Sequence, residues 1–396
     1  MVTPRSRART ELSASVVAVA FLVVAAGPNM PIPLLPYYGQ TLGLGAPELA
    51  VVFSSYFMLL VPALLLMSRP GAQRWPKPML AVALAFAVLA DAVLATGAAP
   101  LLVLGRMMSA LSVAIGTGAA ASLALALKGE RGRTLTATGT FLGALAGMTV
   151  AALIAEFGPA PALLGYVTHG TLACVTLVLA SILLPSVHSA PEVRPAAPTT
   201  RATGRGGSMP YWVGLVMGMI AWAGGAVVVG LVPILARDAF GATSLLLASS
   251  CAITMLVVGS VTQYLLMGAS VRRTGTISLV SFGCGLILLA VAGLTGLVPL
   301  LFVSAAILGF GQGPLYRTGL RIATAGLGLH RQGGRASLYA SCAFGAAAVY
   351  SVTVGVVASA VGAGPGLALA CVGLTVPAII VLARSLRWRA PLRRVS

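Results

Sequence analysis

The stretch SVHSAPEVRPAAPTTRATGRGGSMP, residues 186–210, is the longest polar segment of the chain. It is rich in Pro, Thr, Arg and Gly and has no helical periodicity, which is typical of an unstructured linker. On both sides of it the sequence consists of long apolar runs separated by short loops. The segment therefore divides the chain into two halves, 1–185 and 211–396, and no other loop is long enough to hold a soluble domain.

The composition indicates a membrane protein. Hydrophobic residues make up 58% of the 396 residues and charged residues only 8%, whereas soluble domains carry about 25% charged residues. These few charges are insufficient to cover a soluble protein of this length, so lipid is the expected outer solvent. The net charge of +18 does not indicate nucleic-acid binding, because the basic residues form short clusters between apolar runs.

Twelve apolar runs are long enough to cross a bilayer, which takes about 20 residues per helix, and six lie on each side of the linker. The predicted spans are 13–36, 47–67, 78–97, 100–127, 135–157, 161–185, 211–234, 243–267, 275–295, 297–319, 336–360 and 363–384.

Lys and Arg are distributed unevenly between the loops. They cluster in the N-terminal segment, in every even-numbered loop and in the C-terminal tail, whereas the odd-numbered loops contain Arg237 alone. Since basic residues mark cytoplasmic loops, we expect both termini and the linker in the cytoplasm. The basic N-terminal lead has no convincing cleavage site, so the first apolar run is expected to be retained as a span. High Ala, Gly and Arg with low Lys fits a bacterial genome, and the expected location is the bacterial inner membrane.

The pattern of six spans, a cytoplasmic linker and six more spans resembles the major facilitator superfamily over essentially the whole chain. Arg106 in LVLGRMMSALSVAIGTGAAAS (102–122) is similar to the fourth-helix signature of that family, although Ser109 replaces the usual Gln. The segments GQGPLYR (311–317) and PNMPIPLLP (28–36) are similar to parts of prokaryotic efflux members. The resemblance implies an all-α membrane protein whose twelve transmembrane helices form two six-helix bundles around a central site.

The second loop departs from the family pattern Gly-x-Leu-x-Asp-Arg-x-Gly-Arg-Arg. Here it is SRPGAQRWPK (68–77), in which Ala72 or Ser68, depending on the register, stands in place of the Asp. In the family this carboxylate helps to latch the two halves in one state, so the latch is in doubt for this chain.

Two charged residues lie well inside predicted spans. Arg106 is six residues or so from the outer end of the fourth span, which is roughly 8–9 Å at 1.5 Å per residue. A buried Arg costs about 2.5–3.5 kcal/mol on insertion scales, so we expect it to bind an anionic or polar substrate group; snorkelling to the interface is the alternative. Asp91 lies at similar depth in the third span and could pair with Arg106. It is either a proton carrier or part of a structural ion pair.

Uncharged polar residues are the remaining substrate-binding candidates. Asn29, in the first span, can hydrogen-bond a substrate or satisfy backbone groups freed by the neighbouring prolines. The others share a polar group within a span and could bind an amphipathic solute, with helix packing as the alternative; they are Tyr56, Trp222, Gln263 and Gln312.

Three further features have structural interpretations. His169, in the sixth span, has no second ligand residue nearby and is expected to be structural. Glu156 is expected in the solvated outer interface. The GxxxGxxxG run formed by Gly139, Gly143 and Gly147 predicts close packing of the fifth span against a neighbouring helix.

Motifs of other function classes do not occur in the sequence. It contains no GxxxxGK[ST] nucleotide loop, no HExxH and no GxSxG. The five cysteines are far apart within apolar runs and are expected to be core residues, neither disulfides nor metal ligands. We therefore expect no enzyme activity, no catalytic residue, no metal and no cofactor.

The predicted function is secondary active transport: proton-coupled export of a drug or metabolite by alternating access, carried out by a monomer in the bilayer. Two alternatives stay open, a facilitator without proton coupling and a non-transporting sensor or scaffold. Both are favoured by the missing second-loop Asp and by the lack of an acid in the first span.

Overall fold

The computed structural model describes residues 4–69, 74–128, 130–186, 209–232, 244–266, 268–325 and 329–387. Within these residues every regular element is helical, and twelve helical segments are long and apolar enough to cross a membrane. The all-α, twelve-span prediction is confirmed. Most of the predicted linker, together with Ala72 and Arg237, lies outside the described residues.

The first six spans are built from seven α-helices and two 3-10 turns. The first span comprises α1 (Pro4–Ala26), η1 (Gly27–Asn29), η2 (Ile32–Leu34) and α2 (Leu35–Leu42). The next five are α3 (Ala46–Met67), α4 (Pro76–Leu94), α5 (Ala99–Lys128), α6 (Glu130–Phe157) and α7 (Pro161–Leu183).

The last six spans follow the same plan. They are α8 (Tyr211–Ala226) with the π-helical turn η3 (Val227–Leu231), α10 (Leu245–Leu265), α11 (Val271–Thr295), α12 (Val298–Thr324), α13 (Leu329–Val361) and α14 (Ala363–Arg387). Several helices continue beyond the predicted apolar cores, because polar and basic residues can extend a helix past the lipid. The first span, for example, reaches residue 42 instead of 36.

Prolines break the first span near its middle. Pro28, Pro31, Pro33 and Pro36 have no N–H to donate, and the backbone changes to 3-10 turns with bonds from Met30 N to Gly27 O and from Leu34 N to Pro31 O. The prolines beside Asn29 therefore free backbone groups within the first span, as the sequence analysis assumed.

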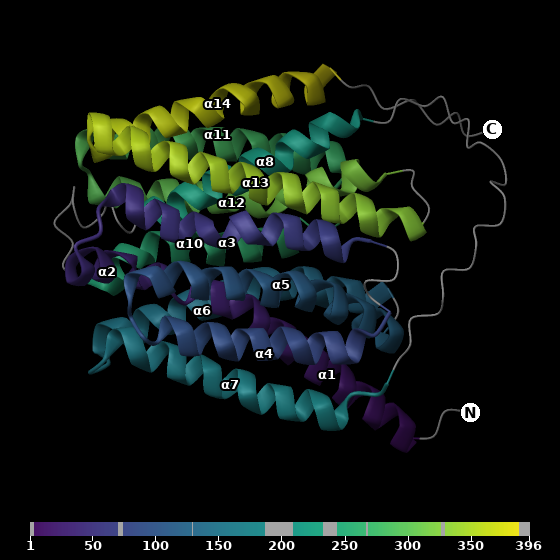
Figure 1. The fold of residues 1–396 in the computed structure, drawn as a ribbon. Helices are drawn as coiled ribbons and strands as arrows, with labels where there is room; N and C mark the ends of the chain where they lie inside the picture. Colours follow the sequence, from purple (N-terminus) through teal and green to yellow (C-terminus); the bar gives the residue numbers. More distant parts are fainter. Residues whose placement is uncertain are drawn as a thin grey trace, which may run out of the picture.

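The two halves pack side by side (Figure 1). Across their boundary α3 packs along α13 and α6 packs along α10. The start of α1 and the end of α14 lie at the same face of the bundle, on the right in Figure 1; we call it the terminal face. The other end, where α2 lies, is called the opposite face.

Large apolar side chains cover the outside of the bundle. Phe157, Ile182, Leu265 and Val349 are each at least 69% exposed, as expected where lipid is the solvent. Cys174 and Cys284 are also exposed, so the expectation that all five cysteines are core residues is wrong for these two: each lies on the outward side of its helix.

Glycines let α6 lie directly on α1. A Cβ atom added at Gly139 would lie 2.8 Å from the Phe21 ring, one at Gly143 would lie 2.6 Å from the Ala25 Cβ, and one at Gly147 would lie 2.3 Å from a backbone oxygen of Ala26. Only residues without a side chain allow this approach. The predicted close packing of the glycine run is confirmed, and it fixes α6 against the part of α1 that precedes the break.

Candidate functional site

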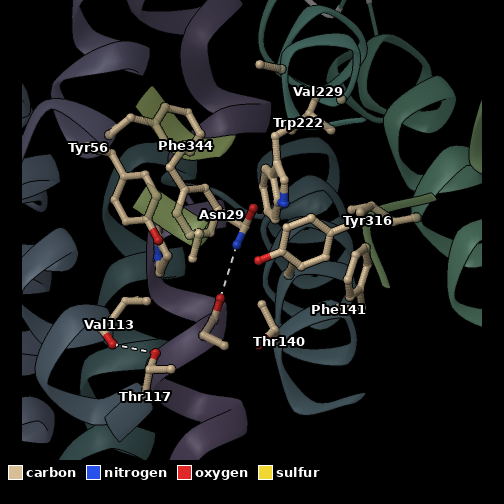
Figure 2. A pocket seen from close by; sticks show the side chains of 18 of the residues that line it. Asn29, Tyr56, Val113, Thr117, Thr140, Phe141, Trp222, Val229, Tyr316 and Phe344 are labelled. Atoms are coloured by element: carbon tan, nitrogen blue, oxygen red, sulfur yellow. Dashed lines mark hydrogen bonds between the residues drawn. The ribbon is translucent and has the colours of Figure 1, made fainter. Parts of the chain in front are cut away.

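A cavity of about 510 Å³ lies between the two halves. Its wall includes residues of α1, η1, η2, α3, α5 and α6 from the first half and of α8, η3, α10, α12 and α13 from the second. The wall extends toward the terminal face, because it includes Leu64 near the end of α3, Thr324 at the end of α12 and Ala336 near the start of α13. Figure 2 shows this space from close by.

Six of the seven candidate residues from the sequence line this cavity: Asn29, Tyr56, Arg106, Trp222, Gln263 and Gln312. In Figure 2, Asn29, Tyr56 and Trp222 point into the same space. The seventh candidate, Asp91, is not part of the wall.

Arg106 joins α5 to the broken first span and to α3. Its side chain is 1% exposed. Nε donates to the Val52 carbonyl at 3.3 Å, one terminal nitrogen donates to the Phe53 carbonyl at 2.7 Å, and the other donates to the Pro28 carbonyl. The guanidinium also lies 5.1 Å from the centre of the Tyr56 ring. The charge is therefore buried within the bundle and solvated by backbone dipoles.

Asp91 pairs with His169 and not with Arg106. Asp91 Oδ2 lies 2.6 Å from His169 Nδ1, and both side chains are buried. The predicted Asp91–Arg106 pair is therefore wrong, because α4 presents Asp91 to α7, where Gly170 leaves room beside the carboxylate. The interpretation of His169 as lacking a partner is wrong as well.

The Asp91–His169 pair is connected to the first span. His169 Nε2 lies 2.9 Å from the Val23 carbonyl, which can only accept, so Nε2 carries a proton. The short contact between Nδ1 and Asp91 holds one more proton, on either the imidazole or the carboxyl group. The pair is electrically neutral in both forms. Val23, which it contacts, lies one turn before the break at Gly27.

An aromatic cluster forms part of the cavity wall. Trp222 lies at its centre, with ring centroids 4.4 Å from Phe344, 5.8 Å from Tyr316, 6.4 Å from Phe141 and 6.5 Å from Phe57. Phe57 and Phe141 belong to the first half, and the other three rings to the second. The sequence analysis singled out only Trp222, because an apolar ring within an apolar span gives no signal of which way it faces.

Two glutamines contact backbone carbonyls in the second half. Gln312 Nε2 donates to the Ala221 carbonyl at 3.2 Å, while Gln312 Oε1 is buried and has no hydrogen-bond partner. Gln263 Nε2 donates to the Gly313 carbonyl at 3.1 Å, and Arg317 donates to the Gln263 carbonyl at 2.8 Å.

A hydrogen bond joins the two halves at the opposite face. Glu156 Oε2, at the end of α6, accepts from the backbone N–H of Leu246 in the first turn of α10 at 3.2 Å. A carboxylate at a helix N-terminus is stabilised by the unpaired N–H groups and by the helix dipole. The expectation that Glu156 is simply solvated is therefore wrong: the residue is half-buried and binds across the boundary.

Among the described residues, no three His, Cys, Asp or Glu side chains come together as a metal site would require. The described wall of the cavity also contains no carboxylate, whereas it contains the cations Arg106 and Arg317.

A family model and two solved structures are similar to this chain. The family model described as Major Facilitator Superfamily matches residues 17–351. The structure is similar to that of the nucleoside transporter NupG (D323A mutant), with a TM-score of 0.67 and 13% identity over 95% of this chain and 99% of that one. It is also similar to an inward-facing, unoccupied bacterial homologue of the human lysosomal transporter Spinster, with a TM-score of 0.70 and 12% identity over 95% and 96%. No curated protein matches significantly. With its twelve spans and central cavity, the chain belongs to the Major Facilitator Superfamily and is a membrane transporter, not an enzyme.

Proposed function

We propose that this protein is a secondary active transporter that exports a small molecule by alternating access, with protons as the coupling ion. The observation that carries the proposal is the cavity, whose wall is built from both halves. A solute held there contacts two bodies that can move relative to each other, which is what alternating access requires.

The direction of export rests on the proposed orientation. The basic clusters favour cytoplasmic termini in a bacterial inner membrane, which would make the terminal face the cytoplasmic one. The cavity extends toward that face, and the Glu156 contact joins the halves at the other. This arrangement would load substrate from the cytoplasm and release it outside after the Glu156 contact opens. The protein would act as a monomer, because one chain supplies both halves.

Proton coupling would use the Asp91–His169 pair. It is the buried acid–base pair of the described spans, and it contacts Val23 just before the break in the first span. A change of its protonation would alter the bond to α1 and, through the break, the cavity wall at Asn29.

A second candidate function is a facilitator without proton coupling. The specific observation in its favour is that the described wall of the cavity holds no carboxylate. Among these wall residues there is therefore no acid that a substrate and a proton could occupy in turn.

The test uses proteoliposomes with an imposed pH gradient and a pH-sensitive dye inside. Lipophilic cations, amphenicols, sugars, amino acids and aromatic acids are added one at a time, with Asp91→Asn as the comparison and protein-free liposomes as the control. Solute-dependent proton flux that is lost in Asp91→Asn supports coupled transport. Solute flux without proton flux supports the facilitator. No flux of any solute despite binding contradicts transport and favours a sensor.

A further inference from the structure

Arg106 is a buried cation without an acidic partner. None of the ion pairs among the described residues includes it; these are Lys128–Glu11 and His169–Asp91. A guanidinium has five N–H donors, and three of those of Arg106 are directed to backbone carbonyls. The cavity wall thus presents a positive charge that carbonyl dipoles solvate only in part. An anionic group would complete this solvation, and a cation would be repelled in the low dielectric of the site.

Gln312 adds an acceptor from the other half. Because the Ala221 carbonyl accepts a hydrogen bond, the atom facing it is the amide nitrogen, and this fixes the direction of Oε1. Gly225 makes room for the amide: a Cβ there would lie 2.2 Å from Gln312 Nε2. A buried acceptor without a partner costs free energy, so an N–H or O–H of a solute in the cavity would supply the partner that Oε1 lacks.

The aromatic cluster supplies flat apolar surfaces between these polar groups. Trp222 is flanked by Phe57 and Phe141 from the first half and by Phe344 and Tyr316 from the second. Figure 2 shows the rings of Trp222, Tyr316 and Phe344 gathered around one space. Offset and edge-to-face contacts between aromatic rings are favourable. A planar solute ring that inserts between two of these side chains would therefore make contacts of the same kind as those it displaces.

We propose that the cavity selects a flat aromatic solute with an anionic group directed to Arg106 and a hydrogen-bond donor directed to Gln312, and that it rejects lipophilic cations. This substrate class rests on the proposed transport function. Such a solute bridges the halves, because Arg106 belongs to α5 and Gln312 to α12.

The binding test uses three probes of one size: 6-hydroxy-2-naphthoate, 2-naphthoate and the cation 2-naphthylmethylammonium. Their affinities for the full chain in lipid nanodiscs are measured by titration calorimetry. We expect both anions to bind at least about tenfold tighter than the cation, as one charge-assisted hydrogen bond provides. Equal or tighter binding of the cation overturns the proposal, and so does the absence of binding by all three probes.

Variants assign the two polar contacts. Gln312→Leu should weaken binding of the hydroxylated probe about threefold or more, relative to 2-naphthoate, and Gly225→Ala should do the same by displacing the amide. Arg106→Lys keeps the charge and should retain the preference for anions, while Arg106→Gln should weaken it, because Arg317 remains in the described wall. Gln40→Leu and Arg272→Gln, which are outside the cavity wall, are matched controls. If Gln312→Leu weakens both naphthoates equally, the assignment of the donor to Gln312 is wrong.

Transport of the same probes separates the two proposals. Binding in the predicted order without movement of any probe across proteoliposomes would refute transport and leave the substrate class intact. Movement of the cation in preference to the anions would refute the substrate class and leave transport intact.

Discussion

The contact between Glu156 and the start of α10 is predicted to hold the opposite face closed. The change Glu156→Gln removes the charge and keeps the size of the side chain. A carboxylate at a helix N-terminus contributes about 0.3–1 kcal/mol at a partly exposed position. At 1.4 kcal/mol per tenfold change, its loss should lower the ratio of closed to open molecules about two- to fivefold. The neutral amide oxygen can still accept from Leu246, so the fold is retained.

The assay measures distances across the opposite face. Spin labels are attached at Thr96→Cys and Thr295→Cys, which lie in exposed positions of the two halves at that face, after replacement of the native cysteines. Double electron–electron resonance spectroscopy then gives the populations of molecules with short and with long distances between the two labels. Glu48→Gln is the matched control, because Glu48 lies in the first turn of its own helix, α3. An unchanged distribution in Glu156→Gln, or an equal shift in Glu48→Gln, would refute this role of the contact.

Three further predictions concern packing, protonation and Arg106. Gly147→Ala should lower the free energy of unfolding by about 1–3 kcal/mol through overpacking, because the added Cβ would meet the backbone of α1. Gly283→Ala is the control: a Cβ there has no neighbour within 4 Å, so this variant should be neutral in thermal unfolding. Equal stabilities of the two variants would contradict the packing argument. Asp91→Asn should leave the protein folded, since an amide can donate to Nδ1 of His169, but should remove the pH dependence of transport in vesicles; an unchanged pH profile would limit the pair to a structural role. Arg106→Gln should abolish transport while the protein still inserts, and full activity would reduce Arg106 to a packing role.

The spans could be predicted from the sequence, because lipid imposes a simple condition on each of them. About 20 apolar residues suffice for a helix that satisfies its own backbone. The proline break was predictable for the same reason, since Pro31 and Pro33 lack the N–H that the helix needs.

The partners of buried residues could not be predicted from the sequence. Position along a helix follows from counting residues, and Asp91 and Arg106 do lie within α4 and α5, where both side chains are buried. Which neighbouring helix a side chain faces depends on how the helices pack together, and that packing is set by contacts between residues far apart in the sequence. Asp91 faces His169, 78 positions away in the sequence, and neither residue lies in a motif that signals this pairing.

The cavity could be predicted only in part for the same reason. Polar residues inside spans are rare, so Asn29, Gln263 and Gln312 were visible as candidates. Phe141 and Phe344 line the same cavity, but lipid-facing rings have the same sequence signal. The Glu156 contact was missed because it depends on the packing of α6 against α10.

The most direct test of the central claim is to join the two halves at the opposite face and measure transport. Cysteines replacing Glu156 and Leu246, which are in contact across the boundary, are linked by a short cleavable bifunctional reagent in proteoliposomes loaded with a transported solute, with each single cysteine as a control. Alternating access predicts that counterflow falls to the level of protein-free liposomes when the linker is present and returns when it is cleaved. Counterflow at the full rate with the halves joined would contradict the account.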